Sequence, residues 1–188
     1  MIGLNNTKIT SDVKLIEEIH KFPNKSLKEN TLQHANIILI RGLPGSGKTS
    51  FADMIDYDYC IATDDFFIKD GIYDFKPELL PVNHNKCIKM VKEKVNRHRT
   101  LGCNIVVHNT FSERWEMQPY INIALEYGFN YRVTDIYDGG LNDEELFKRN
   151  EHGVPLESIC NMRSRWEFNW RVGNPNPPWE RNMDENNA

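Results

Sequence analysis

A glycine-rich turn between two regular segments constrains this chain more than any other feature. Residues 42–49 read GLPGSGKT and fit G-x-x-x-x-G-K-[ST], the pattern of a phosphate-binding loop. The apolar, β-branched residues 36–41 before it predict a buried strand, and residues 50–55 after it can continue as a helix. The first amides of a helix have no carbonyl partner and carry partial positive charge, so they hold an anion. The segment therefore predicts phosphate binding, and the preceding strand makes a chance glycine turn a poor alternative.

Each residue type in the loop has a physical role. Glycines let the backbone curl around a phosphate without a side chain in the way. Lys48 can reach the β- and γ-phosphates of a nucleotide, and the Thr49 hydroxyl can bind Mg²⁺. We thus predict Lys48 as a catalytic residue and Thr49 as the metal ligand. The predicted nucleotide-binding residues are Gly42, Pro44, Gly45, Ser46, Gly47, Lys48, Thr49 and Ser50.

Bulk composition narrows the class of protein. A chain of 188 residues with 39% hydrophobic residues suits one α/β domain with small appendages. No apolar run approaches the ~20 residues of a membrane helix, and the N-terminus lacks a signal-peptide pattern, so we expect an intracellular, cytoplasmic protein without membrane contact. The net charge of −4 disfavours wrapping of long nucleic acid but leaves open a pocket for a small acceptor or one strand end. Four well-separated cysteines without a C-x-x-C pair indicate free thiols in the core.

Strand and helix patterns alternate along the chain. Short apolar runs predict strands at 59–62, 104–108 and 131–137, and residues 68–82 are predicted to be a loop. Alternation of this kind indicates a largely parallel sheet covered on both faces. We expect an N-terminal arm (1–35) with an amphipathic helix at 12–21, an α/β domain that contains the phosphate-binding loop (36–170) and a polar proline-rich tail (171–188). Helices are predicted at 82–101, 113–127, from an N-cap at Asn142, and 155–168.

Polar residues follow three of the predicted strands. In an open α/β sheet ligands bind beyond the carboxyl ends of the strands, so the glycine loop, residues 63–65 and residues 108–110 are expected to converge. Phosphoryl transfer needs a carboxylate that accepts the proton of the acceptor hydroxyl. Of the adjacent Asp64 and Asp65, one can face the acceptor while the other caps a turn; alternatively both are turn residues. The acceptor-side candidates are Asp65, His108, Asn109 and Thr110.

A charged segment follows the last predicted strand. Kinases often close a mobile lid whose arginine meets the charge of the transition state, and Arg149 is placed to do so. From the residues alone, simple solvation is the better interpretation of Arg149, and the same holds for His152, Arg163 and Arg165. The basic residues of the helix at 82–101 are interpreted as a solvated face rather than a nucleic-acid patch.

Taken together, these motifs resemble the polynucleotide-kinase-like P-loop kinases, which carry an AAA-type ATP-binding domain. That family includes the 5′-kinase domain of phage polynucleotide kinase, and the likeness is closer to the animal Nedd-four-binding-protein-two-like proteins. It spans about residues 36–167 and leaves out the arm and the tail. The matching segments are RGLPGSGKT (41–49), TDDFF (63–67), WEMQPY (115–120) with Ala124, and RNEHGV (149–154).

The resemblance implies a three-layer P-loop kinase fold with a small helical lid, and ATP with Mg²⁺ as cofactors. It implies that Asp64 is the general base, that Arg149 is the lid arginine and that the acceptor is a 5′-hydroxyl of DNA or RNA. Two departures fall on the acceptor side: His108 to Phe111 replace the family's Asp-Asn-Thr-Asn, and Phe67 stands where phage kinase has arginine. ATP binding is therefore a firmer expectation than polynucleotide phosphorylation. A small nucleoside-like acceptor, or a nucleotide-binding interaction module with little catalysis, remains an alternative. The sequence leaves the oligomeric state open.

Overall fold

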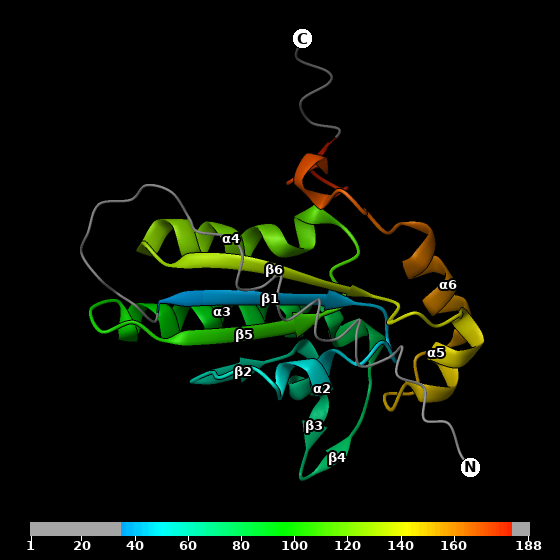
Figure 1. Ribbon diagram of the computed structural model, residues 1–188. Coiled ribbons are helices and arrows are strands. Elements are labelled where there is room, and N and C mark those ends of the chain that lie inside the picture. The colour runs from blue at the N-terminus through cyan, green and yellow to red at the C-terminus, as the bar shows by residue number, and fades with distance from the viewer. Residues whose placement is uncertain (1–34, 182–188) are drawn as a thin grey trace, which may run out of the picture. The chain divides into compact units, whose positions relative to one another are not determined.

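A four-stranded parallel sheet forms the centre of the molecule. The computed structural model describes residues 35–181, and its sheet has the order β2-β5-β1-β6. The strands are β1 (Asn36–Gly42), β2 (Tyr59–Ile61), β5 (Asn104–Asn109) and β6 (Asn130–Tyr137), and β1 lies between β5 and β6. All three pairings are parallel, so the carboxyl ends of all four strands lie at one edge (Figure 1). The predicted α/β P-loop kinase fold with a mainly parallel sheet is confirmed.

Helices cover the sheet because alternate strand residues are apolar on both faces. Ile37, Leu39, Ile105 and Val107 share one face and pack in the main core with α3 (Leu80–His98) and α4 (Arg114–Tyr127). Ile40 and Val106 of the opposite face are also fully buried. The short helix α2 (Lys48–Ala52) contacts both β1 and β5. The remaining helices are α5 (Asp143–Arg149) and α6 (Leu156–Ser164), and the 3₁₀ turns are η1 (Thr63–Phe67), η2 (Pro77–Leu79) and η3 (Trp170–Val172).

The segment 68–82 is more regular than its sequence indicates. The prediction of a loop is wrong here: β3 (Ile68–Lys69) and β4 (Ile72–Tyr73) form an antiparallel hairpin, and η2 leads directly into α3. Asp70 and Gly71 make the turn with positive φ at both positions. Strands of two residues are too short for an alternating pattern to be detected. Most of the other predicted elements occur within one to three residues of their expected bounds, but α6 ends at Ser164 rather than near 168.

Helices α5 and α6 form a small unit beyond the arrowheads of β1 and β6 (Figure 1). Asn142 caps α5 as predicted: its side chain accepts from the Glu145 amide at 2.9 Å and the Glu145 carboxylate accepts from the Asn142 amide. A second buried cluster, Leu43, Leu146, Ile159 and Trp166, joins these helices to the glycine loop. Hydrophobic packing thus attaches the helical unit to the phosphate-binding end of the sheet.

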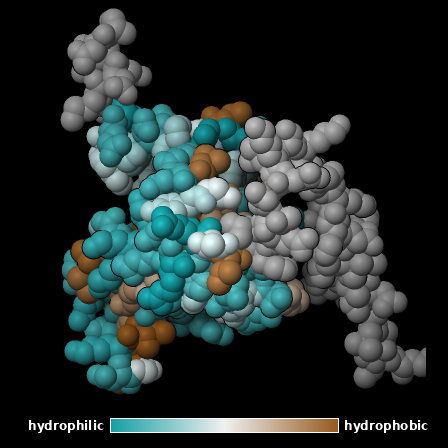
Figure 2. All heavy atoms as spheres, turned by 90° about the vertical axis from the view of Figure 1, so that its left-hand side faces the viewer, coloured by the Kyte–Doolittle hydropathy of each residue, from teal (hydrophilic) through white to brown (hydrophobic). Residues whose placement is uncertain are grey.

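One face of the molecule is mostly polar. Figure 2 shows a largely hydrophilic face with separate apolar side chains rather than a continuous apolar patch. No helix within residues 35–181 is long and apolar enough to cross a membrane.

The four cysteines are free; Cys87 and Cys103 are buried, whereas Cys160 is exposed, so the expectation of a core position is wrong for Cys160. The predicted helix at 12–21 lies outside the described residues, and the three-part division of the chain stays a prediction.

Candidate functional site

The loop between β1 and α2 has the backbone of an anion cradle. Gly45 and Gly47 adopt φ of 79° and 96°, a region that favours glycine. The first hydrogen bond of α2 runs from the Phe51 amide to the Gly47 carbonyl at 2.9 Å, so the amides of residues 47–50 have no partner within the helix. The Ser46 hydroxyl is buried and lacks a hydrogen-bond partner within the described chain. These donors fit a group that brings its own oxygen atoms, such as a phosphate.

Lys48 carries a charge that the protein leaves uncompensated. Its Nζ donates to the Leu43 carbonyl at 3.0 Å, and no carboxylate of residues 35–181 lies within ion-pair distance of it. Burial in the loop lowers the pKa of Lys48 to about 8, and the charge of Asp64 opposes that shift only in part. A bound phosphate would supply the missing anion. The loop residues therefore fit the triphosphate of a nucleotide.

The base of the helical unit supports the loop directly. A Cβ on Gly45 would collide with the Leu146 carbonyl oxygen and would come within 3.2 Å of the Asn150 amide nitrogen. A Cβ on Gly139, in the turn after β6, would lie 2.7 Å from the Ser46 carbonyl oxygen. The Leu43 amide also donates to the Tyr137 carbonyl at 2.7 Å. Backbone therefore packs on backbone here, and the glycines permit the close approach.

This packing predicts different effects of substitution at Gly45 and Gly47, which look equivalent in the motif. We expect Gly45→Ala to lower the free energy of unfolding by about 1–2 kcal/mol more than Gly47→Ala. Both substitutions strain a positive φ, but a Cβ at Gly47 meets nothing within 4 Å. Urea unfolding of the two variants without nucleotide measures the difference. Equal destabilisation would show that α5 does not rest on the loop.

The predicted convergence of strand ends is confirmed by hydrogen bonds. The side chain of Asn109, the last residue of β5, accepts from the Thr63 amide at 2.9 Å, and the Thr110 carbonyl accepts from the Gly42 amide at 3.1 Å. His84 of α3 shares a hydrogen bond of 3.2 Å with the Thr63 hydroxyl. Burial lowers the pKa of His108, so this side chain is neutral at neutral pH. The three polar segments thus form one edge of the sheet next to Lys48.

The adjacent aspartates differ in their surroundings. Asp65 caps its own turn, because its Oδ2 accepts from the Ala62 amide at 2.8 Å. Asp64 has a half-exposed side chain, accepts from the Tyr73 hydroxyl at 3.3 Å and lies 3.8 Å from His152 Nε2. The sequence offers one alternative in which one carboxylate caps a turn and the other faces the acceptor; Asp65 is the one that caps, although it is also the more exposed of the two. Asp64 makes no such cap and stays the predicted base.

Four other predicted residues lie on or after α5. Arg149 is the last residue of α5, exposed, and without a hydrogen bond or ion pair in the described part of the chain. The backbones of Leu146 and Asn150 approach Gly45, so the end of α5 lies near the loop. Arg163 is structural: it contacts Asp138 and Asp143 at 2.6 Å each, which ties α6 to α5. Arg165 pairs with Glu116 at 3.7 Å, away from Asp64, whereas His152 contacts Asp64.

Sequence reasoning missed a buried arginine just before the loop. Arg41 is fully buried and donates to the Ser112 and Glu167 carbonyls at 2.9 Å each. Its guanidinium lies 4.0 Å from the Trp166 ring centroid and 3.4 Å from Asp135. Burial lowers the pKa of Arg41, and the charge of Asp135 opposes the shift. The group fixes the end of β1 to the chain that follows α6. The signal that could have revealed it is an arginine inside an apolar run.

A magnesium ion would rely on few protein ligands. No cluster of three histidine, cysteine or carboxylate side chains able to hold a metal occurs among residues 35–181. Mg²⁺ is often bound by one or two protein oxygens together with phosphates and water. Thr49 is exposed at the start of α2, which fits that arrangement.

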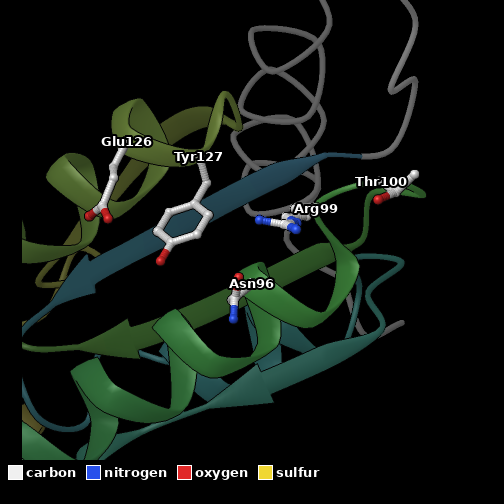
Figure 3. A pocket seen from close by; sticks show the side chains of 5 residues that line it. All are labelled: Asn96, Arg99, Thr100, Glu126 and Tyr127. Carbon is white, nitrogen blue, oxygen red and sulfur yellow. The ribbon is translucent and has the colours of Figure 1, made fainter.

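A separate hollow lies at the other end of the sheet. Asn96, Arg99, Thr100, Glu126 and Tyr127 line about 590 Å³ near the ends of α3 and α4 (Figure 3). These helix ends lead into β5 and β6, so the hollow lies at the amino ends of the strands, remote from the loop. It therefore takes no part in the candidate site.

Comparisons with known proteins agree with this geometry. The sequence model of the AAA domain family matches residues 37–167. Human NEDD4-binding protein 2 is 31% identical over 137 residues; these cover 70% of this chain but only 8% of the human protein. The solved structure of the Pnkp1/Rnl/Hen1 RNA repair complex contains a chain with TM-score 0.52 and 23% identity, over 74% of this chain and 46% of the other. A second structure of the complex has a TM-score of 0.45 and 24% identity, covering 65% and 41%.

The structural likeness supports the fold, and the family match covers more than half of the sequence. The matched residues 37–167 include the glycine loop, Asp64 and Arg149. The resemblance to polynucleotide-kinase-like P-loop proteins that the motifs predict is thereby confirmed. The chain belongs to the AAA domain family of P-loop proteins, with a kinase-like nucleotide site.

Proposed function

We propose that the protein is an ATP-dependent phosphotransferase that moves the γ-phosphate of ATP to a 5′-hydroxyl of a polynucleotide. One observation carries the proposal: the Lys48 ammonium, which has no ion-pair partner among residues 35–181, and the half-exposed carboxylate of Asp64 follow the carboxyl ends of strands at the same end of the sheet. A cation for the phosphates and a base for the acceptor are the two groups that phosphoryl transfer requires of the protein.

In this mechanism the loop amides and Lys48 hold the β- and γ-phosphates. The acceptor hydroxyl oxygen forms the new bond to the γ-phosphorus, the bond to the β–γ bridging oxygen breaks, and ADP leaves. Asp64 accepts the proton of the attacking hydroxyl. Arg149, at the end of α5, is the residue assigned to meet charge on the transferred group. Mg²⁺ bound near Thr49 would neutralise phosphate charge.

The class of acceptor is inferred from the similar proteins and from the net charge of the chain. The name of the structural neighbour, an RNA repair complex, favours a nucleic-acid end. The net charge of −4 instead favours a small nucleoside-like acceptor, which needs no basic surface. The altered segment 108–111, which departs from the family pattern, motivates a third candidate: a nucleotide-binding module with weak or no catalysis.

A labelling experiment separates these functions. The protein is incubated with Mg²⁺, ATP labelled at the γ-phosphate, and DNA or RNA oligonucleotides with a free 5′-hydroxyl or with a 5′-phosphate as matched control. The proposal predicts label only on the 5′-hydroxyl oligonucleotides. Label confined to nucleosides or sugars from a parallel acceptor panel supports the small-molecule kinase. Tight ATP binding with no labelled product supports the binding module.

A further inference from the structure

Three separate segments meet at the Asp64 carboxylate. Asp64 belongs to η1, Tyr73 ends the β3–β4 hairpin, and His152 follows α5 in the lid segment 149–154. Tyr73 and His152 lie 4.7 Å apart between ring centroids. The hairpin and the lid segment therefore touch each other next to the predicted base. Arg149 is the one residue of these two segments that is predicted to contact phosphate.

The two contacts of Asp64 use different oxygen atoms. The Tyr73 hydroxyl donates to Oδ1 at 3.3 Å, whereas His152 Nε2 lies 3.8 Å from Oδ2. The second distance is beyond that of a good hydrogen bond, so Oδ2 is the oxygen left to a new donor. An acceptor hydroxyl that approaches Asp64 can thus bind Oδ2 while Tyr73 stays in place.

The surroundings of Tyr73 fix its role as a donor. Its ring contacts Phe67 edge-on, with centroids 6.1 Å apart, and this holds β4 against η1. Burial and the neighbouring Asp64 charge raise the pKa of Tyr73 well above its ordinary value. The phenol therefore keeps its proton at neutral pH, and its O–H donates a hydrogen bond to the carboxylate.

We propose that Tyr73 is a positioning residue for phosphoryl transfer. Its hydroxyl holds Oδ1 of Asp64 so that Oδ2 is presented to the acceptor hydroxyl, and His152, packed on its ring, joins the lid segment to the same carboxylate. The inference rests on the proposed transfer function. It also accounts for the acceptor side of a chain that has Phe67 where phage kinase has an arginine: the hairpin supplies a polar contact to the base, and Phe67 supports the hairpin.

The variant Tyr73→Phe tests the hydroxyl while leaving the ring. Tyr59→Phe is the matched control, because the Tyr59 hydroxyl shares a hydrogen bond of 2.9 Å with His98, outside the site. We expect Tyr73→Phe to lower kcat about tenfold with an unchanged KM for ATP and an unchanged melting temperature. Tyr59→Phe should keep the wild-type kcat. In the Asp64→Asn background, adding Tyr73→Phe should lower the residual rate no further, because both act through one carboxylate.

Two outcomes would overturn the inference. One is a wild-type kcat in Tyr73→Phe; the other is that Tyr73→Phe lowers kcat by the same factor in the wild-type and Asp64→Asn backgrounds. If the wild-type protein labels no acceptor, the proposed function fails, and the positioning contact is tested by nuclear magnetic resonance instead. The carboxyl carbon signal of Asp64 should then shift in Tyr73→Phe and stay unchanged in Tyr59→Phe. An unmoved signal would show that Tyr73 does not hold the carboxylate.

Discussion

Asp64→Asn is expected to lower kcat for phosphoryl transfer by about 10²–10⁴-fold while ATP affinity stays close to that of the wild type. The amide keeps the size of the side chain and its contact with Tyr73, but it cannot accept the proton of the acceptor hydroxyl. Single-turnover transfer of labelled phosphate gives the rate, and isothermal titration with ATP gives the affinity.

The neighbouring Asp65→Asn provides the comparison. Its side-chain oxygen can still accept from the Ala62 amide, so we expect a loss of at most about 1 kcal/mol of stability and at most a few-fold change in kcat. A large loss in Asp65→Asn together with normal transfer in Asp64→Asn would reverse the assignment of the base. Similar losses in both variants would indicate disruption of η1 rather than loss of a proton acceptor.

Lys48→Met should have opposite effects on the free protein and on the nucleotide complex. In the free protein it removes a charge that the loop buries without an anion, so we expect stability to rise by about 1–2 kcal/mol at pH 7. The expected gain is roughly half of the free energy that corresponds to the lowering of the Lys48 pKa, because the side chain remains partly exposed to solvent. With Mg²⁺ and ATP at ~100 times Kd, the wild type should gain about 2.7 kcal/mol, and the variant should lose most of that gain.

The stability of the wild-type protein should depend on pH, because the folded and unfolded states bind protons at Lys48 with different pKa values. The folded-state pKa of Lys48, about 8, is below its ordinary value of 10.5. Below pH 8 the lysine is charged in both states, and the folded state carries the full cost of burial. Between about 8 and 10.5 the unfolded chain binds one more proton than the folded protein, so the free protein gains stability as the pH rises. Lys48→Met should abolish that rise.

An exposed lysine of α3 serves as the control for both measurements. Lys92 lies at the surface beside Glu126, and Lys92→Met should change stability by less than about 0.5 kcal/mol and leave the ATP response intact. Urea unfolding between pH 7 and 10.5, with and without Mg²⁺ and ATP, tests all three proteins. ATP that stabilises Lys48→Met as much as the wild type would contradict the assigned role of the loop.

The fold could be predicted because its signals are local and repeated. The run at 36–41 followed by the glycine loop fixes a strand, a turn and a helix start within about fifteen residues. The alternation of apolar runs with helical segments then determines a parallel sheet. The different surroundings of Asp64 and Asp65 could be anticipated as well, since two adjacent side chains leaving a strand cannot point the same way.

What could not be predicted depends on contacts between distant segments. Tyr73 lies in a two-residue strand with no detectable period, and its hydrogen bond to Asp64 exists only because the hairpin folds back over η1. Arg41 is fully buried although arginine is mostly exposed, and its carbonyl partners come from residues 71 and 126 positions further along the chain. Gly45 could be predicted as a residue of the glycine turn, but its close contact with α5, and that of Gly139 with Ser46, could not.

The central claim is that the loop amides and Lys48 hold a triphosphate whose γ-phosphate faces Asp64. A crystal structure of the protein with Mg²⁺ and a non-hydrolysable ATP analogue tests it most directly. We expect the β- and γ-phosphates within hydrogen-bond distance of Lys48 Nζ and the amides of residues 47–50, with the γ-phosphate on the side of the Asp64 carboxylate. A nucleotide bound away from the loop, or a γ-phosphate turned away from Asp64, would contradict it.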